Sequence, residues 1–240
     1  MKKLVVAVLA LGLVGCSTPA PAPESTHSGT VNVFAAASLT GSFEEIAAAF
    51  EAENPNVDVV FNFGGSSSLA TQIVEGAPAD VFAAASPATM EASGATGAQD
   101  FATNVLEIAV ADGNPGAIEG LPDFADPERL IALCAVEVPC GAASAKLLEA
   151  SGITPSVDTY EQDVKAVLTK VSLGEVDAGL VYVTDVLEAG SEVEGIEVES
   201  DPVAYPIVGL TDSEAAAAFI SFVLSDKGQS ILRAAGFGAP

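Results

Sequence analysis

The sequence predicts an α/β protein with mostly parallel sheet, and three observations lead to this fold class. Short β-branched or aromatic runs alternate with stretches that carry apolar residues at helical spacing. Clusters of Gly, Pro and Asn separate these segments at short intervals. Half of the 240 residues are hydrophobic, and many of them are alanine, which suits close packing of helices on a sheet. Repeated strand–helix units imply helices on both faces of the sheet.

The expected elements follow one another from residue 31 to the C-terminus. Two helices are expected to begin with capping boxes, Ser42 with Glu45 and Thr211 with Glu214. Ser86 and Pro87 are expected to start another helix as its N-cap and first residue. The remaining assignments are strands at 31–36, 57–63, 80–85, 105–111, 130–135, 178–183 and 203–210, and helices at 42–53, 69–75, 142–151 and 164–173.

The first 29 residues are expected to precede the folded body. Residues 1–15 read as a signal peptide, because Lys2 and Lys3 precede an apolar run too short to span a bilayer. Residues 13–16 resemble the bacterial lipoprotein signal, whose cleavage leaves Cys16 as a lipid-bearing N-terminus. An ordinary secretory signal that happens to contain a cysteine is the alternative. Residues 16–29 are rich in Pro, Ala and Ser and are predicted to be a disordered tether. The chain is therefore expected outside the cytoplasm, anchored to the cell membrane.

The charge of the chain excludes some partners. The formal net charge is −25, and loss of Lys2 and Lys3 leaves 6 Lys and Arg against 33 Asp and Glu, or −27. Such a surface repels nucleic acid and anionic membranes. An anion site in this chain must therefore rely on local dipoles. Solubility of an exported protein is the plainer explanation of the acidity.

Histidine usage excludes several enzyme classes. His27 is the only histidine and lies in the predicted tether, so Ser-His-Asp hydrolysis, Cys-His chemistry and histidine zinc sites are not expected in the body. No P-loop is present, and no G-x-G-x-x-G follows a strand. Carboxylates are abundant, so a secreted enzyme that uses Asp or Glu stays open as the minority interpretation.

Three bends with small residues follow predicted strands, at Ser38, at 64–68 and at 136–141. Ligands of such sheets bind beyond the carboxyl ends of the strands, and helix starts present free N–H groups to anions. Taken singly, the bend at 64–68 could also be a flexible linker or a simple N-cap, although its place directly after a predicted strand favours a built bend, and the bend at 136–141 could also be a turn held by a disulfide. Likewise Asp163 alone predicts only a helix start, and Tyr182 alone only a core aromatic residue.

Cys134 and Cys140 form an even pair in the folded body. Export to an oxidising compartment permits a disulfide between them, and the spacing does not require one. A bridge would hold the backbone N–H of Cys140 in place.

Taken together, the bends resemble successive signatures of the molybdate-binding proteins of ABC importers. The matching segments are 34–40, 64–73, 76–82, 138–141, 163–164 and 179–182, in this order, and the resemblance covers Thr30 to the C-terminus. Two departures are visible. Cys140 stands where the family often has alanine, and Ser86-Pro87 replaces a common acidic residue.

The resemblance implies a two-lobed periplasmic-binding-protein fold. Each lobe is a mostly parallel sheet flanked by helices, and the ligand lies in the cleft between the lobes. Residues 30–105 and 201–240 would form lobe 1, and residues 106–200 lobe 2. The resemblance assigns the anion contacts to the hydroxyls of Ser38, Ser66 and Tyr182 and to the backbone N–H groups of Cys140 and Val164.

The function that the resemblance implies is capture of molybdate, with tungstate also accepted, and delivery to an ABC permease in the membrane. No catalysis, no cofactor and no metal beyond the molybdenum of the oxyanion are expected, and the protein is expected to be a monomer that touches the membrane only through lipid at Cys16. Sulfate, phosphate or another tetrahedral oxyanion is the alternative ligand. A carboxylate-dependent lipoprotein enzyme and a structural surface lipoprotein are the alternatives from other classes.

Overall fold

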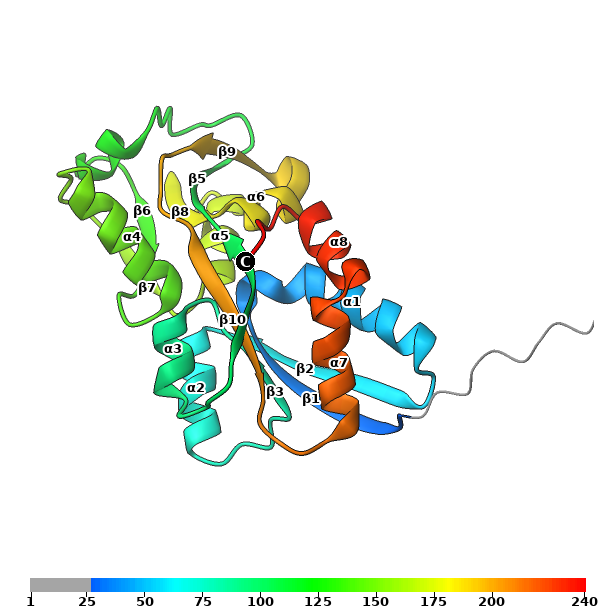
Figure 1. Ribbon diagram of the computed structural model, residues 1–240. Coiled ribbons are helices and arrows are strands. Elements are labelled where there is room, and N and C mark those ends of the chain that lie inside the picture. Colours follow the sequence, from blue (N-terminus) through cyan, green and yellow to red (C-terminus); the bar gives the residue numbers. More distant parts are fainter. Residues whose placement is uncertain (1–26) are drawn as a thin grey trace, which may run out of the picture.

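The computed structural model describes residues 27–240, which form two five-stranded sheets with helices packed on them (Figure 1). The predicted signal peptide, Cys16 and residues 16–26 of the predicted tether lie outside the described residues. The first strand begins at Gly29, one residue before the predicted start of lobe 1.

The first sheet has the strand order β2-β1-β3-β10-β4. Its strands are β1 (Gly29–Ala36), β2 (Val57–Gly64), β3 (Val81–Ala83), β4 (Gln99–Asn104) and β10 (Val203–Gly209). The pairings of β1 with β2 and with β3 are parallel. β10 is antiparallel to both β3 and β4, because β4 leads towards the second sheet and β10 leads back from it.

The second sheet has the order β7-β6-β8-β5-β9. Its strands are β5 (Leu106–Ala111), β6 (Ile131–Cys134), β7 (Thr159–Glu161), β8 (Ala178–Tyr182) and β9 (Val193–Glu197). β6 is parallel to β7 and β8, and β5 is antiparallel to β8 and β9. The α/β class is confirmed, but both sheets are mixed, so the prediction of mostly parallel sheets is wrong for the pairings of β10 and β5.

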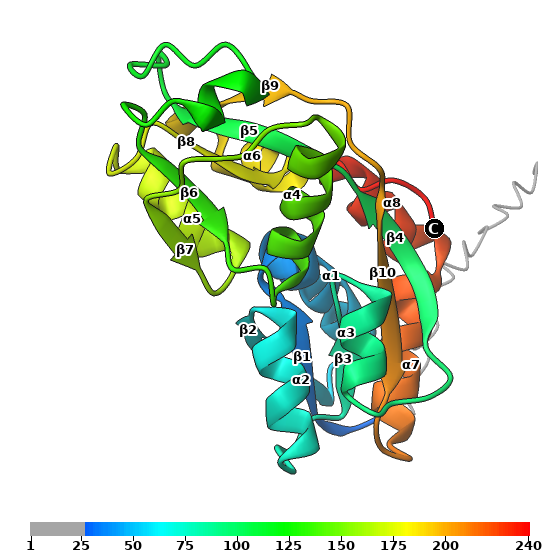
Figure 2. The same ribbon diagram turned by 90° about the vertical axis from the view of Figure 1, so that its left-hand side faces the viewer.

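Two connections join the sheets, Val105 between β4 and β5 and residues 198–202 between β9 and β10. In Figure 2 the two sheets lie one above the other, and β4 and β10 run side by side along one edge. The predicted lobe boundaries fall in these connections, and the exact boundaries stay a prediction. We use lobe 1 for the first sheet with its helices and lobe 2 for the second.

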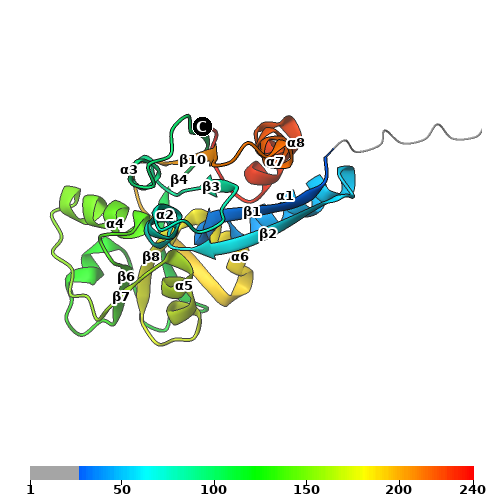
Figure 3. The same ribbon diagram turned by 90° about the horizontal axis from the view of Figure 1, so that it is seen from below.

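Helices cover both faces of the first sheet, as Figure 3 shows from below. One face carries α1 (Thr40–Glu53), α7 (Glu214–Leu224) and α8 (Asp226–Ala234) over a core that includes Phe43, Phe50 and Phe219. The other carries α2 (Ser66–Val74) and α3 (Pro87–Ala92) over Phe34 and Phe82. On the second sheet, α4 (Pro139–Ala150) and α5 (Val164–Ser172) contribute Leu148, Val167 and Val171 to a separate core.

The remaining helices are short, namely the 3₁₀ segments η1 (Ala37–Leu39), η2 (Leu121–Ala125) and η3 (Gly190–Glu192) and the helix α6 (Val183–Ala189). Within residues 27–240, no helix combines the length and the apolar character needed to cross a bilayer.

Both predicted capping boxes are wrong. α1 begins at Thr40, and Ser42 lies inside its first turn, where its hydroxyl donates to the carbonyl of Leu39. α7 is capped by Ser213, which accepts from the N–H of Ala216, while the hydroxyl of Thr211 donates to Asp80. The helix start at Ser86 and Pro87 is confirmed, because the Ser86 side chain accepts from the N–H of Thr89.

Candidate functional site

A small cavity lies between the two lobes and collects all five residues that the sequence singles out. Its volume is about 20 Å³, on the order of one or two waters. Its lining comes from β1, β2, α2, α4, α5 and β8 and their flanking loops: Ala36, Ala37, Ser38, Gly64, Gly65, Ser66, Ala85, Val138, Pro139, Cys140, Asp163, Val164 and Tyr182. No lysine or arginine is among these described residues, so the cavity is lined without a cation.

Three helices of nine or more residues begin at this cavity: α2 at Ser66, α4 at Pro139 and α5 at Val164. The first turn of each helix has backbone N–H groups without intrahelical partners, and the helix dipole places partial positive charge there. Ser38 lies in η1, which leads into α1, and Tyr182 directly precedes α6. These helix starts therefore bring partial positive charge to the cavity from neutral groups, which suits an anion.

Each of the two serine hydroxyls already has one hydrogen-bond partner within the protein. The Ser66 oxygen accepts from the N–H of Ala85 at 3.0 Å, so its O–H is free to donate into the cavity. The Ser38 oxygen lies 2.9 Å from the hydroxyl of Tyr205 in β10. When Tyr205 donates in this bond, the Ser38 hydroxyl also donates into the cavity. Both serines are buried, at 3% and 1% exposure for Ser38 and Ser66.

Tyr182 supplies a third hydroxyl. This oxygen is buried and has no hydrogen-bond partner in the part of the chain that the structure describes. Burial raises the pKa of Tyr182 well above its ordinary value, so the phenol keeps its proton at neutral pH. A buried donor without a partner costs stability, and a bound anion would satisfy it.

Cys140 and Val164 lie at the second and first positions of their helices, where backbone N–H groups are free. A disulfide joins Cys140 to Cys134 at the end of β6, with a Cα–Cα distance of 5.7 Å. The next residue must be glycine, because a Cβ at Gly141 would overlap the carbonyl oxygen of Ala135. The bridge and the close approach fix the start of α4 on β6. Asp163 also lines the cavity, and its carboxylate caps α5 by accepting from the N–H of Ala166.

The lobes touch each other at the rim of the cavity. The Ser67 hydroxyl in α2 donates to the carbonyl of Glu137 in lobe 2 at 2.6 Å. Gly65 lies against the carbonyl of Gln162, and a Cβ there would overlap this oxygen. Beside the connection at Val105, the buried side-chain amide of Asn104 in lobe 1 donates to the Thr184 hydroxyl in lobe 2 at 2.8 Å. The cleft is closed in this structure.

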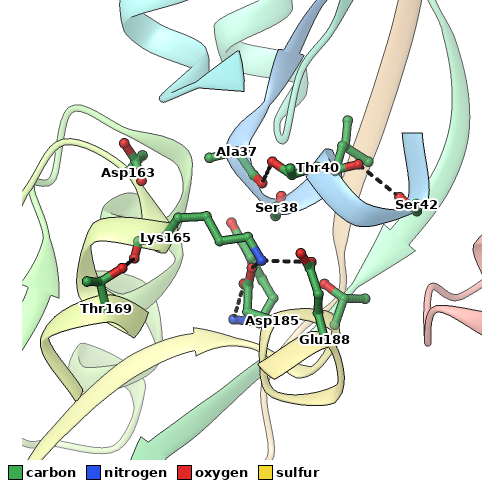
Figure 4. A network of polar contacts seen from close by, with 12 residues as sticks. Ala37, Ser38, Thr40, Ser42, Asp163, Lys165, Thr169, Asp185 and Glu188 are labelled. Atoms are coloured by element: carbon green, nitrogen blue, oxygen red, sulfur yellow. Dashed lines mark hydrogen bonds and ion pairs between the residues drawn. The ribbon is translucent and has the colours of Figure 1, made fainter. Parts of the chain in front are cut away.

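A network of charged groups lies behind the cavity, between α5 and α6 (Figure 4). The Lys165 ammonium is 3.2 Å from Asp185 and 2.7 Å from Glu188. Asp185 is completely buried, and its other oxygen accepts from the N–H of Tyr182 at 3.1 Å. Burial raises the pKa of Asp185 to about 6, against the opposing effect of Lys165. Burial alone would lower the pKa of Lys165, but the carboxylates of Asp185 and Glu188 raise it.

The sequence did not point to Tyr205, Asp185 or Lys165. Tyr205 reaches Ser38 across 167 positions of the chain, and no local pattern announces such a contact. Asp185 had a signal, since an acidic residue three positions after the end of a strand is typical of a helix start. Among residues 27–240, no group of three or more His, Cys, Asp or Glu side chains is arranged to hold a metal ion.

Comparison with known proteins identifies the family of the chain. Residues 31–238 match the family model described as bacterial extracellular solute-binding protein. The molybdate-binding protein ModA of Mycobacterium tuberculosis is 38% identical over 252 residues, which cover 99% of this chain and 97% of that protein.

Two solved structures share the fold. The periplasmic molybdate-binding protein of Azotobacter vinelandii superposes with a TM-score of 0.72 at 23% identity, covering 88% of this chain and 99% of that one. The sulfate-binding protein SubI of Mycobacterium tuberculosis superposes with a TM-score of 0.74 at 18% identity, covering 88% of this chain and 86% of that one. The fold alone therefore does not choose between these anions. The family match and the mycobacterial relative together show that the chain belongs to the bacterial extracellular solute-binding proteins, as a member of the ModA family.

Proposed function

We propose that this protein captures molybdate, and also tungstate, outside the cytoplasm and delivers it to an ABC importer. The observation that carries the proposal is that five residues with neutral donor groups, from two lobes, line one small cavity. These donors are the hydroxyls of Ser38, Ser66 and Tyr182 and the N–H groups of Cys140 and Val164. The 38% identical relative is named a molybdate-binding protein, which supports this anion.

Neutral donors are sufficient for a dianion. A hydrogen bond to a charged group contributes about 1.5–3 kcal/mol net, so several together offset the loss of hydration. The sum exceeds the affinity, because ordering and desolvation oppose binding. Because the five proposed groups can all donate, they favour an anion without a proton. Hydrogen phosphate would place its own O–H against another donor, so phosphate is disfavoured.

Sulfate is the alternative ligand, since it has the same charge and shape and differs from molybdate in size. The structural likeness to a sulfate-binding protein keeps this alternative in view. Hydrolysis or another reaction is not expected: the cavity lining includes one carboxylate, Asp163, which already caps α5, and no histidine. No cofactor is needed for binding of this kind.

The proposal includes the membrane side of transport. Cys16 carries the lipid that anchors the chain, and residues 16–29 act as the tether between the anchor and the body. The closed monomer docks on the permease, and opening of the lobes releases the anion. Replacement of Cys16 by serine is expected to move the protein from the membrane fraction to the soluble fraction.

Calorimetric titration of the purified body with molybdate, tungstate, sulfate and phosphate tests the proposal. Molybdate and tungstate are expected to bind tightly with one anion per chain, sulfate at least about 100-fold more weakly, and phosphate without measurable heat. If sulfate bound as tightly as molybdate, the protein would be a general dianion-binding protein and not one selective for molybdate. Consumption of a substrate without stoichiometric anion binding would favour the enzyme alternative.

A further inference from the structure

The feature behind this inference is a buried negative charge beside a site proposed for anions. Asp185 is completely buried and accepts from the backbone N–H of Tyr182, the residue whose hydroxyl lines the cavity. After the larger effect of burial, its negative charge also helps to raise the pKa of both Tyr182 and Tyr205. An uncompensated carboxylate here would repel a dianion.

Lys165 is placed to cancel this charge. Residues 27–240 carry six lysines and arginines, and Lys165 is the least exposed of these described cations, with 25% of its side chain accessible. It follows Val164 at the start of α5, and its ammonium bridges Asp185 and Glu188. Figure 4 shows the Lys165 side chain reaching from α5 to these two carboxylates, with Ser38 and the first turn of α1 above them in this view.

The groups around Asp185 come from several elements. Lys165 approaches from α5, Glu188 lies one turn further along α6, and Tyr182 of β8 and Tyr205 of β10 have pKa values that the charge of Asp185 helps to raise. Glu188 reaches the other lobe, since a Cβ at Gly41 in α1 would lie 3.0 Å from its carboxyl carbon. On that side Glu188 shares a surface pocket with Glu45. Lys165 therefore pairs with two acidic residues where lobe 2 contacts α1 of lobe 1.

We infer that Lys165 is a positioning residue of the anion site. Its ammonium neutralises the buried carboxylate of Asp185, so that the cavity can bind a dianion without protonation of Asp185. The inference rests on the proposed function, because it concerns the same cavity. In the native protein the pair Lys165–Asp185 has no net charge, and above pH 7 anion affinity is independent of pH. Without the ammonium, Asp185 must be protonated before the anion binds.

This role makes a specific prediction for Lys165→Met. Above pH 7 the affinity for molybdate is expected to fall at least about 10-fold. It is also expected to gain a pH dependence, with the dissociation constant rising about tenfold per pH unit from about pH 7 to 9, because one proton is bound with each anion. Molybdate has no proton to lose in this range, so the slope belongs to the protein.

Two further variants separate charge from structure. Asp185→Asn in the Lys165→Met background removes the buried charge and keeps an oxygen for the Tyr182 N–H, so it is expected to restore near-native affinity without pH dependence. Lys170→Met is the matched control, because Lys170 lies on the same helix, is 31% exposed and pairs with Glu161 at 3.2 Å, away from the cavity lining. It is expected to leave molybdate binding unchanged.

The measurement is calorimetric titration of all four proteins with molybdate at three pH values. Native affinity without pH dependence in Lys165→Met would overturn the inference. So would a double variant, Lys165→Met with Asp185→Asn, that is folded by circular dichroism but does not regain molybdate affinity. If the native protein does not bind molybdate at all, the proposed function fails instead, and the two results are distinct.

Discussion

Gly65 offers the sharpest test of whether the closed cleft is the binding form. Replacement by alanine adds one methyl group at the N-cap of α2, where the backbone angles (φ −60°, ψ 125°) suit alanine as well as glycine. The new Cβ would overlap the carbonyl oxygen of Gln162, and the carbonyl carbon would be 3.3 Å away. Because Gln162 belongs to the other lobe, the folded lobes themselves are undisturbed and only their approach is blocked.

The expected loss follows from hydrogen-bond geometry. To restore an ordinary carbon–oxygen contact, the two segments must separate by about 1 Å or more. The donors of lobe 2 (Cys140, Val164 and Tyr182) then move away from an anion held by lobe 1, and bonds near 2.9 Å stretch beyond the range in which they are strong. Loss of two such bonds, at about 1.5–3 kcal/mol each, amounts to about 3–6 kcal/mol. Affinity is expected to fall by about 10²- to 10⁴-fold.

Calorimetric titration with molybdate measures this loss, and thermal unfolding of the anion-free protein checks the fold. The melting temperature of the anion-free Gly65→Ala protein is expected to stay within about 2 °C of native or to rise slightly. Gly120→Ala is the control, because Gly120 lies outside the cavity lining and a Cβ there would meet Pro122 at an ordinary 3.6 Å. Native affinity in Gly65→Ala would refute the reasoning that the anion is held by both lobes at once.

Three further predictions concern single groups. Tyr182→Phe removes a buried hydroxyl that has no protein partner among the described residues, so affinity for molybdate is expected to fall about 10- to 100-fold while the anion-free protein loses no stability. Tyr160→Phe on the exposed edge strand is the control. Equal affinities in both variants would contradict the role of the phenol. Replacement of Cys134 and Cys140 by serine is expected to lower the free energy of unfolding by about 2 kcal/mol in urea titrations, since the bridge closes a loop with a sequence separation of 6; an unchanged value would show that the bridge does not restrict the unfolded chain. The pKa of Asp185 is about 6 in the folded protein and lower in the unfolded chain, so its contribution to stability is present at about pH 4 and is lost as the pH rises through 6; Asp185→Asn is expected to remove this loss, and identical pH–stability profiles for the two proteins would disprove it.

The residues that local chemistry controls could be found from the sequence. Ser38, Ser66, Cys140 and Val164 each follow a strand and start a helix or lead into one. Bends of this kind are visible along the chain, but the choice of these four residues as anion contacts depends on the resemblance to the molybdate-binding family. The disulfide is a similar case, because a spacing of a few residues after a strand already permits it. The structure brings all five predicted residues to one cavity, and whether they bind the anion stays a prediction.

Contacts between distant segments could not be predicted in this way. The Ser38–Tyr205 bond and the antiparallel pairing of β10 depend on where the chain re-enters the first sheet, which no local pattern encodes. The capping boxes failed for a related reason. α1 continues directly from η1 after β1, so its first turn lies upstream of Ser42 and the serine bonds back to Leu39 instead. Short polar strands such as β7 and β9 lack the apolar alternation that marks a strand.

The central claim is that five neutral donors from two lobes hold one oxyanion. A crystal structure of the protein with molybdate, with the molybdenum located by its anomalous scattering, tests this most directly. The account predicts one molybdenum atom in the cavity, with its oxygens within about 2.7–3.2 Å of the hydroxyls of Ser38, Ser66 and Tyr182 and the N–H groups of Cys140 and Val164. Molybdenum bound at a surface lysine or arginine, or held in the cavity by one lobe only, would contradict it.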